Sequence, residues 1–294
     1  MQLTGWRIYA PWLDRKGGFW PLGAACFALL LIPALLVAFD GAFGRLGPKP
    51  WTQAVHDTGT WAVRILLVSL AVSPLRRILD WNRLIGVRRM IGVAAMAYGL
   101  LHLTLYCIDL AFDWGLIVSE IVKRCYLVVG ITALIGLVAL GVTSTDAMIR
   151  RMGGKNWQRL HNLVYLITGL ALLHFALQSK IDVTQPALMT GLFGLLLLYR
   201  LAIRLKWPLT PLNLALVGLG AGLLTAVCET AWYAFATGAS AFDVFQANFD
   251  VWYYPGLDML RPGHWVALAG LGVAAIALLR KPATPRERRR EATA

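Results

Sequence analysis

Eight long apolar stretches constrain this chain more than any other feature of its sequence. Each holds about 20 mostly apolar residues, the length that an α-helix needs to cross a bilayer. The composition agrees, because 58% of the 294 residues are hydrophobic and 15% are charged, whereas soluble domains have roughly 45–50% apolar and about 25% charged residues. The expected fold class is therefore an all-α polytopic membrane protein, a helical bundle of about eight transmembrane helices. The expected spans are residues 19–39, 59–79, 91–111, 126–145, 161–178, 186–203, 212–236 and 264–279.

The basic residues alternate between the two sides of these spans. Of the 28 lysines and arginines, 21 lie near the two chain ends or beside every second connection, and six lie in the other connections. Cytoplasmic loops of membrane proteins carry such an excess of Lys and Arg, so both termini are expected in the cytoplasm. The basic tail RERRREATA is expected to contact anionic lipid. Because the net charge of +13 is spread between apolar runs, the chain lacks the clustered basic face of a nucleic-acid-binding protein.

Histidines within the spans are the first candidate functional residues, since ionisable side chains inside a bilayer are rare and usually functional. His102 lies thirteen residues after Arg89, and His174 lies fifteen residues after Arg159. Both spans run outward from the cytoplasmic edge, so both imidazoles should lie about 20 Å above it. Two imidazoles at one depth on parallel helices can ligate one iron from opposite sides, as in a bis-histidine b-type haem. The alternative is that each histidine merely hydrogen-bonds a neighbouring helix.

Residues one turn away from these histidines suit a haem. Gly99 and Ala171 each lie three positions before a histidine and leave room for a flat macrocycle. Tyr106 and Gln178 each lie four positions after one, and they are candidates for hydrogen bonds at the haem rim.

Three further polar residues, in or near the spans, have two interpretations each. Arg64, near the outer end of the second span, either pairs with a haem propionate, because arginine matches carboxylates in a bidentate way, or extends its charge to the headgroups. His56 either caps the second span or contacts a haem edge. Glu229, well inside the seventh span, either carries protons or forms a structural pair.

His161 is a third candidate ligand, at the cytoplasmic end of the fifth span and about 20 Å from His174. Thirteen residues at 100° each would place these two side chains roughly 140° apart around a regular helix. The matching positions on the third span hold Arg88 and Arg89 rather than a histidine. His161 is therefore either a ligand of a second haem or an interfacial histidine near the headgroups.

A glycine-rich run in the seventh span predicts packing rather than nucleotide binding. The run GLGAG covers residues 218–222 and lies inside an apolar stretch. It has no preceding strand, so it lacks the context of a dinucleotide-binding motif. Small residues in this setting favour close contact between membrane helices.

The chain also resembles a known family, the MsrQ (YedZ) family of the ferric-reductase-like transmembrane superfamily. The segments that carry this resemblance are VHDTGTWAVRILLVSLAVSPLRR, RRMIGVAAMAYGLLHLTLY, VTSTDAMIRRMGGKNWQRLHNLVYLI and LLHFALQSK, which together span roughly residues 20–205. The resemblance implies a six-helix b-type cytochrome with one or two haems and with FMN as a further cofactor. His102, His161 and His174 match the family's haem histidines, while Arg88 and Arg89 stand where a fourth would be expected.

The function that this resemblance implies is electron transfer in a bacterial inner membrane. The chain would pass electrons from the quinol pool, or from a cytoplasmic flavin reductase, to a periplasmic molybdopterin subunit that reduces methionine sulfoxide in oxidised proteins. No substrate site of its own is evident. The alternative is a stand-alone haem reductase that acts on metal ions or oxygen at the outer face. A transporter that uses the histidines as a proton relay would need more polar residues along its spans.

Two domains are expected on these grounds. Residues 1–208 would form the ferric-reductase-like haem-binding domain, and residues 209–294 a two-helix extension with a basic cytoplasmic tail. Since the extension goes beyond the six helices of the family, it is a packing addition, a quinone site or a docking element.

Overall fold

The chain is a multi-pass membrane protein built from helices. The computed structural model describes residues 10–13, 17–179, 182–252, 256 and 259–279, and every named element in these ranges is helical. Eight helical segments are long and apolar enough to span a membrane, which confirms the predicted number. The basic tail and its expected lipid contact lie outside the described residues. The eight segments are Pro21–Ala42, Pro50–Ile78, Asn82–Asp109, Cys125–Val142, Gly154–Gln178, Thr184–Arg204, Pro211–Thr237 and Pro262–Leu279.

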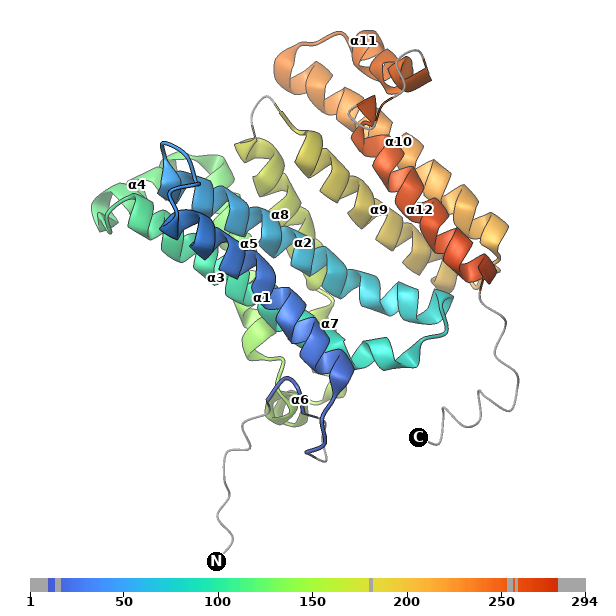
Figure 1. Ribbon diagram of the computed structural model, residues 1–294, viewed down its shortest axis with the longest axis horizontal. Helices are drawn as coiled ribbons and strands as arrows, with labels where there is room; N and C mark the ends of the chain where they lie inside the picture. The colour runs from blue at the N-terminus through green and yellow to red at the C-terminus, as the bar shows by residue number, and fades with distance from the viewer. Residues whose placement is uncertain (1–9, 14–16, 180–181, 253–255, 257–258, 280–294) are drawn as a thin grey trace, which may run out of the picture. The chain divides into compact units, whose positions relative to one another are not determined.

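Figure 1 labels the α-helices in chain order, and shorter helices connect several of the spans. The spanning α-helices are α1 (Pro21–Ala42), α2 (Pro50–Ile78), α3 (Arg88–Asp109), α5 (Cys125–Val142), α8 (Val164–Gln178), α9 (Thr184–Arg204), α10 (Pro211–Thr237) and α12 (Pro262–Leu279). The connecting helices are η1 (Asn82–Val87), α4 (Trp114–Lys123), α6 (Asp146–Met152), α7 (Gly154–His161), α11 (Ala241–Gln246) and η2 (Ala247–Trp252).

Helix α2 begins nine residues earlier than hydropathy predicts. Pro50 occupies its first turn, where a missing N–H costs nothing because that group has no partner within the helix. Polar side chains in the next turns bond to one another and to α3: Gln53 donates to Asp57, and Thr52 donates to Asp109 at 3.0 Å. His56 therefore lies inside the helix, and the interpretation that it caps the second span is wrong.

Contacts within the chain group it into two compact units. Unit 1 comprises Met1–Ser69 and Arg83–Thr168, and unit 2 comprises Leu70–Asn82 and Gly169–Ala294. The predicted division of the chain after residue 208 stays a prediction. The two units are described one at a time below.

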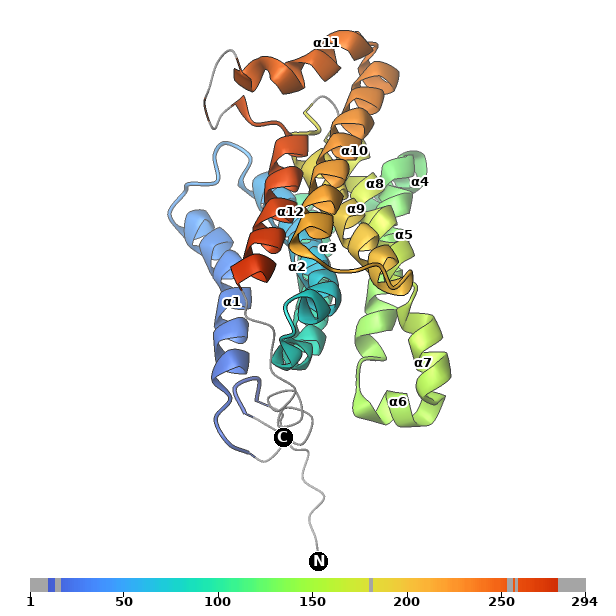
Figure 2. The same cartoon turned by 90° about the vertical axis from the view of Figure 1, so that its right-hand side faces the viewer.

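In unit 1, α3 packs between α1 and α5. Glycines allow close approach, because a Cβ on Gly99 would lie 2.9 Å from Leu134 of α5 and a Cβ on Gly141 would collide with Met96 of α3. Helices α6 and α7 form a hairpin beyond the end of α5 (Figure 2). An exposed ion pair between Arg89 and Asp146, at 2.6 Å, links the start of α3 to the start of α6.

Tyr98 of α3 joins the hydrogen bonding of α1. Its hydroxyl donates to the carbonyl of Leu30 at 2.7 Å and accepts from the N–H of Ala34 at 2.9 Å. These two main-chain groups would bond each other in a regular helix, and the neighbouring Pro33 opens the turn. The phenol thus hydrogen-bonds two main-chain groups of the turn that contains Pro33.

We predict that Tyr98→Phe weakens unit 1 through these two main-chain groups. Removing the hydroxyl takes a partner from a part-buried N–H and a part-buried carbonyl, at a cost of about 1 kcal/mol. Thermal unfolding of the detergent-solubilised protein should show a lower midpoint. Tyr126→Phe is the control, because Tyr126 accepts from Arg124 in an exposed contact. Equal midpoints for the two variants would contradict this role of Tyr98.

In unit 2, α9, α10 and α12 pack side by side (Figures 1 and 2). A Cβ on Gly218 would lie 2.8 Å from the Cα of Gly270, and one on Gly222 would lie 2.6 Å from the carbonyl oxygen of Gly263. The backbones of α10 and α12 therefore touch along this line. The structure confirms that the GLGAG run of α10 serves helix packing.

The same helix pair encloses a buried ion pair. Arg261, just before α12, donates from Nη2 to Oε1 of Glu229 at 2.8 Å. The side chain of Glu229 is fully buried, whereas that of Arg261 is 28% exposed. Among the described residues, Oε2 of Glu229 and Nε of Arg261 are buried without a hydrogen-bond partner. The interpretation of Glu229 as a paired residue is confirmed.

Candidate functional site

His102 is held by a main-chain carbonyl of α2. It lies on α3, is half-buried, and its Nδ1 is 2.8 Å from the carbonyl oxygen of Val55. A carbonyl can only accept a hydrogen bond, so Nδ1 carries the proton. The lone pair that can bind a metal is then on Nε2. This arrangement suits an axial haem ligand, whose second ring nitrogen is usually bonded to a carbonyl or carboxylate.

The imidazole of His102 lies against a glycine of α2. A Cβ on Gly59 would be 2.8 Å from Nδ1 and 2.9 Å from Cε1 of His102, closer than real Cβ contacts. Any other residue at position 59 would displace the ring. Sequence reasoning missed Gly59, although a glycine inside an apolar span was a signal of close approach.

Gly99 has a different role from the one predicted. The space beside it is filled by Leu134 of α5, which would lie 2.9 Å from an added Cβ. It therefore serves the contact between α3 and α5, and the prediction that it makes room for a macrocycle is wrong.

His174 lies near the end of α8, four residues before its last residue, Gln178. His102 lies seven residues before Asp109, the last residue of α3. At 1.5 Å per residue these positions are about 6 Å and about 10 Å from the ends of their helices. Because His102 belongs to unit 1 and His174 to unit 2, their pairing stays a prediction.

His161 ends α7 and makes contacts of its own within unit 1. Its ring stacks on Trp157, with centroids 3.9 Å apart, and its Nε2 is 3.2 Å from the hydroxyl of Thr143. That hydroxyl donates to the carbonyl of Ala139 at 2.7 Å, so it accepts from His161. Nε2 of His161 thus carries a proton here.

The fifth span is not one regular helix. Helix α7 ends at His161, and α8 begins at Val164 after a two-residue turn. The indole Nε1 of Trp157 donates to the carbonyl of Thr143 at 2.8 Å and fixes α7 against the end of α5. The predicted angle of roughly 140° between His161 and His174 assumed a continuous helix, so it does not apply.

The predicted rim residues are spread over three helices. Arg64 lies fourteen residues after the start of α2, deeper than predicted, with its guanidinium 4.8 Å from the ring centroid of Trp61. His56 is exposed on α2, while Tyr106 on α3 and Gln178 on α8 are half-buried. Their contacts with a haem stay predictions.

Comparison with known proteins identifies the family. Residues 58–172 match the family described as ferric reductase like transmembrane component. The protein-methionine-sulfoxide reductase heme-binding subunit MsrQ of Rhodospirillum rubrum is 43% identical over 178 residues, which are 60% of this chain and 86% of that protein. The chain belongs to the MsrQ family. Proteins of the same name from Caulobacter vibrioides and Herminiimonas arsenicoxydans are 41% and 37% identical, over 60% and 69% of this chain and 82% and 91% of theirs. No solved structure matches the chain.

The matched ferric reductase region contains part of the candidate ligand set. Residues 58–172 include His102, His161 and Gly59, and they end two residues before His174. The ion pair of Glu229 and the packed helices α10 and α12 lie beyond that region.

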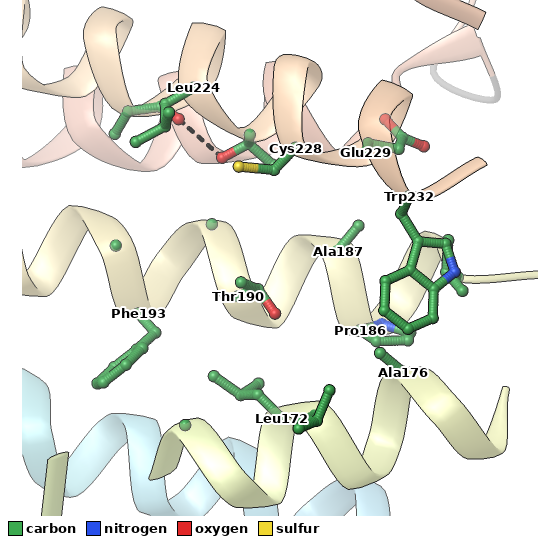
Figure 3. Close-up of a pocket in the computed structure, with 17 residues that line it drawn as sticks. Leu172, Ala176, Pro186, Ala187, Thr190, Phe193, Leu224, Cys228, Glu229 and Trp232 are labelled. Atoms are coloured by element: carbon green, nitrogen blue, oxygen red, sulfur yellow. Dashed lines mark hydrogen bonds between the residues drawn. The ribbon is translucent and has the colours of Figure 1, made fainter. Parts of the chain in front are cut away.

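Unit 2 also contains an apolar cavity of about 420 Å³ among α8, α9 and α10. Leu172 and Ala176 line it from α8, and Trp232 extends from α10 toward Ala176 and Pro186 (Figure 3). The polar or polarisable side chains in its mostly apolar lining include Thr190, Thr225, Cys228 and Glu229. Its volume is within the roughly 300–1,000 Å³ typical of small-molecule sites.

Proposed function

We propose that this chain is the haem-binding membrane subunit of a methionine sulfoxide reductase system. The observation that carries the proposal is the bond from Nδ1 of His102 to the carbonyl of Val55, which leaves Nε2 as the ligand nitrogen inside a membrane span. The family supports it, because the relatives compared above are named heme-binding subunits.

His102 and His174 are the proposed axial ligands of one haem b. Both lie toward the C-terminal ends of their helices, and the distribution of Lys and Arg predicts that both helices run outward from the cytoplasmic side. Haem held by two imidazoles supplies one-electron transfer. The chain contributes the ligands, their depth in the membrane and an apolar surrounding.

The other predicted site residues have secondary parts in this proposal. Arg64 pairs with a haem propionate, while His56, Tyr106 and Gln178 lie near the haem rim. His161 would ligate a second haem through Nε2 only after losing its bond to Thr143. One haem per chain is therefore the expected stoichiometry, and a ratio of two would identify His161 as a further ligand. FMN stays an implication of the resemblance, without a residue assigned to it.

Quinol is the proposed electron donor, and the acceptor is a periplasmic molybdopterin subunit. An apolar cavity such as that of unit 2 suits a membrane-soluble donor. A cytoplasmic flavin reductase is the second candidate, because 21 of the 28 basic residues lie on the predicted cytoplasmic side and would attract an acidic partner. The protein would lie in the inner membrane with both termini in the cytoplasm.

Spectroscopy of the purified protein tests this function. The detergent-solubilised chain should show a reduced b-type α-band after dithionite, with about one haem per chain. A short-chain quinol should reduce this haem without any added reductase, and the periplasmic subunit with methionine sulfoxide should reoxidise it.

Each other outcome has a defined meaning. Absence of the α-band contradicts the function as a whole. Reduction by NADH, flavin and a flavin reductase, but not by quinol, moves the donor to the cytoplasmic side. Reoxidation by ferric iron or oxygen at rates unaffected by the periplasmic subunit favours the stand-alone reductase.

A further inference from the structure

We infer that Gly59 and the main-chain carbonyl of Val55 act together as the positioning element of His102. Neither residue touches the iron in this inference, and α2 supplies no ligand there. Their effect is to fix which ring nitrogen faces the metal and how the imidazole plane is turned. The inference rests on the proposed function, in which His102 binds haem.

Contacts of α2 with α3 bring the ring to this place. Thr52 near the start of α2 bonds Asp109 at the end of α3, whereas Ser69 lies near Gly92 at the start of α3, 3.5 Å from an added Cβ. The two helices are therefore antiparallel neighbours. His102 meets α2 between these two contacts, at the turn from Val55 to Gly59.

The glycine makes the carbonyl of Val55 reachable. In a regular α-helix this carbonyl already accepts from the N–H of the residue four positions later, which is Gly59. A donor from outside must approach across the surface of residue 59. Because Gly59 has no Cβ, the ring of His102 can lie on this surface with Nδ1 at 2.8 Å from the oxygen.

Thr58 competes for the same oxygen. Its side chain is fully buried, and its hydroxyl is 2.7 Å from the carbonyl of Ala54 and 3.1 Å from that of Val55. A hydroxyl has one proton, so the shorter contact takes most of it. The carbonyl of Val55 therefore stays available to accept from Nδ1 of His102.

This bond has a chemical consequence for a bound haem. An imidazole that donates from Nδ1 is a more basic ligand through Nε2, with a fixed tautomer and ring orientation. A more basic ligand favours ferric over ferrous iron and lowers the midpoint potential. Helix α2 thus tunes the potential of the haem through one carbonyl.

Gly59→Ala tests the inference directly. The new Cβ should push the imidazole off the carbonyl, so haem retention should fall about 10–100-fold, as for other outer-shell changes. The haem that remains should have a higher midpoint potential and changed ferric EPR g-values. Alanine favours a helix more than glycine, so weaker α2 formation would not explain a loss. Gly220→Ala is the matched control, because nothing lies within 4 Å of its added Cβ.

Thr58→Val provides a second measurement that does not depend on steric displacement. It removes the weaker, 3.1 Å contact of the hydroxyl with the carbonyl of Val55 and leaves that carbonyl to His102, so the midpoint potential should stay at the wild-type value or shift slightly downward, with haem content unchanged. Wild-type potential and g-values in Gly59→Ala, or an upward shift in Thr58→Val, would overturn the inference. Absence of haem from the wild-type protein would instead refute the proposed function.

Discussion

Replacing His102 or His174 with alanine should abolish the b-type haem spectrum of the purified protein. Each substitution removes one proposed axial ligand. The dithionite-reduced α-band should disappear, and haem per chain should fall at least about 10-fold. Pyridine haemochrome content and reduced-minus-oxidised spectra measure both quantities.

His264→Ala is the control for these two substitutions. His264 lies in α12, where its Nδ1 accepts from the N–H of Arg261 at 3.1 Å. Its loss should leave the haem spectrum unchanged. A normal spectrum in either His102→Ala or His174→Ala would show that the two do not share a haem. His161→Ala should keep the α-band, since that histidine is engaged by Thr143 and Trp157.

The spans were predictable because their signal is local. A run of about 20 apolar residues has few other ways to satisfy its backbone inside a bilayer, and eight such runs became eight candidate spans. The polar start of α2 and the turn at residues 162–163 were not predictable in this way. Both depend on side-chain bonds, such as that of Thr52 with Asp109, that hydropathy does not contain.

The candidate ligand His102 could be singled out from the sequence, but the groups that hold its ring could not. His102 stood out because a histidine inside a span is rare. Its acceptor is a backbone oxygen 47 positions away on another helix. Every residue has such a carbonyl, so the sequence does not show which one accepts. Gly59 is visible in the sequence as a glycine inside an apolar span. Such a glycine more often indicates helix packing, as Gly99 and Gly218 do here.

The partner of Glu229 could not be identified from the sequence for a similar reason. Its removal is the second substitution with a large expected effect, here on stability. Arg261 is 32 positions away, in the connection before α12. Removing it by Arg261→Met should leave the carboxylate of Glu229 buried without its cation. Breaking a buried pair in this way costs about 3–5 kcal/mol, so the thermal midpoint in detergent should fall strongly.

The two sides of this pair should respond unequally. The Glu229 side chain is fully buried, whereas the Arg261 side chain is 28% exposed and can be hydrated. Glu229→Gln should therefore cost less than Arg261→Met. The double variant should recover much of the loss, because it leaves no buried charge unpaired.

An exposed pair in the same chain provides the matched comparison. Arg89 and Asp146 are 2.6 Å apart, with side chains 47% and 44% exposed. Arg89→Met should cost no more than about 1 kcal/mol, the usual limit for a solvated ion pair. If Arg261→Met and Arg89→Met lower the midpoint equally, burial of Glu229 does not decide the stability of unit 2. If the double variant is no more stable than Arg261→Met, the loss comes from packing of the long arginine side chain rather than from an unpaired carboxylate.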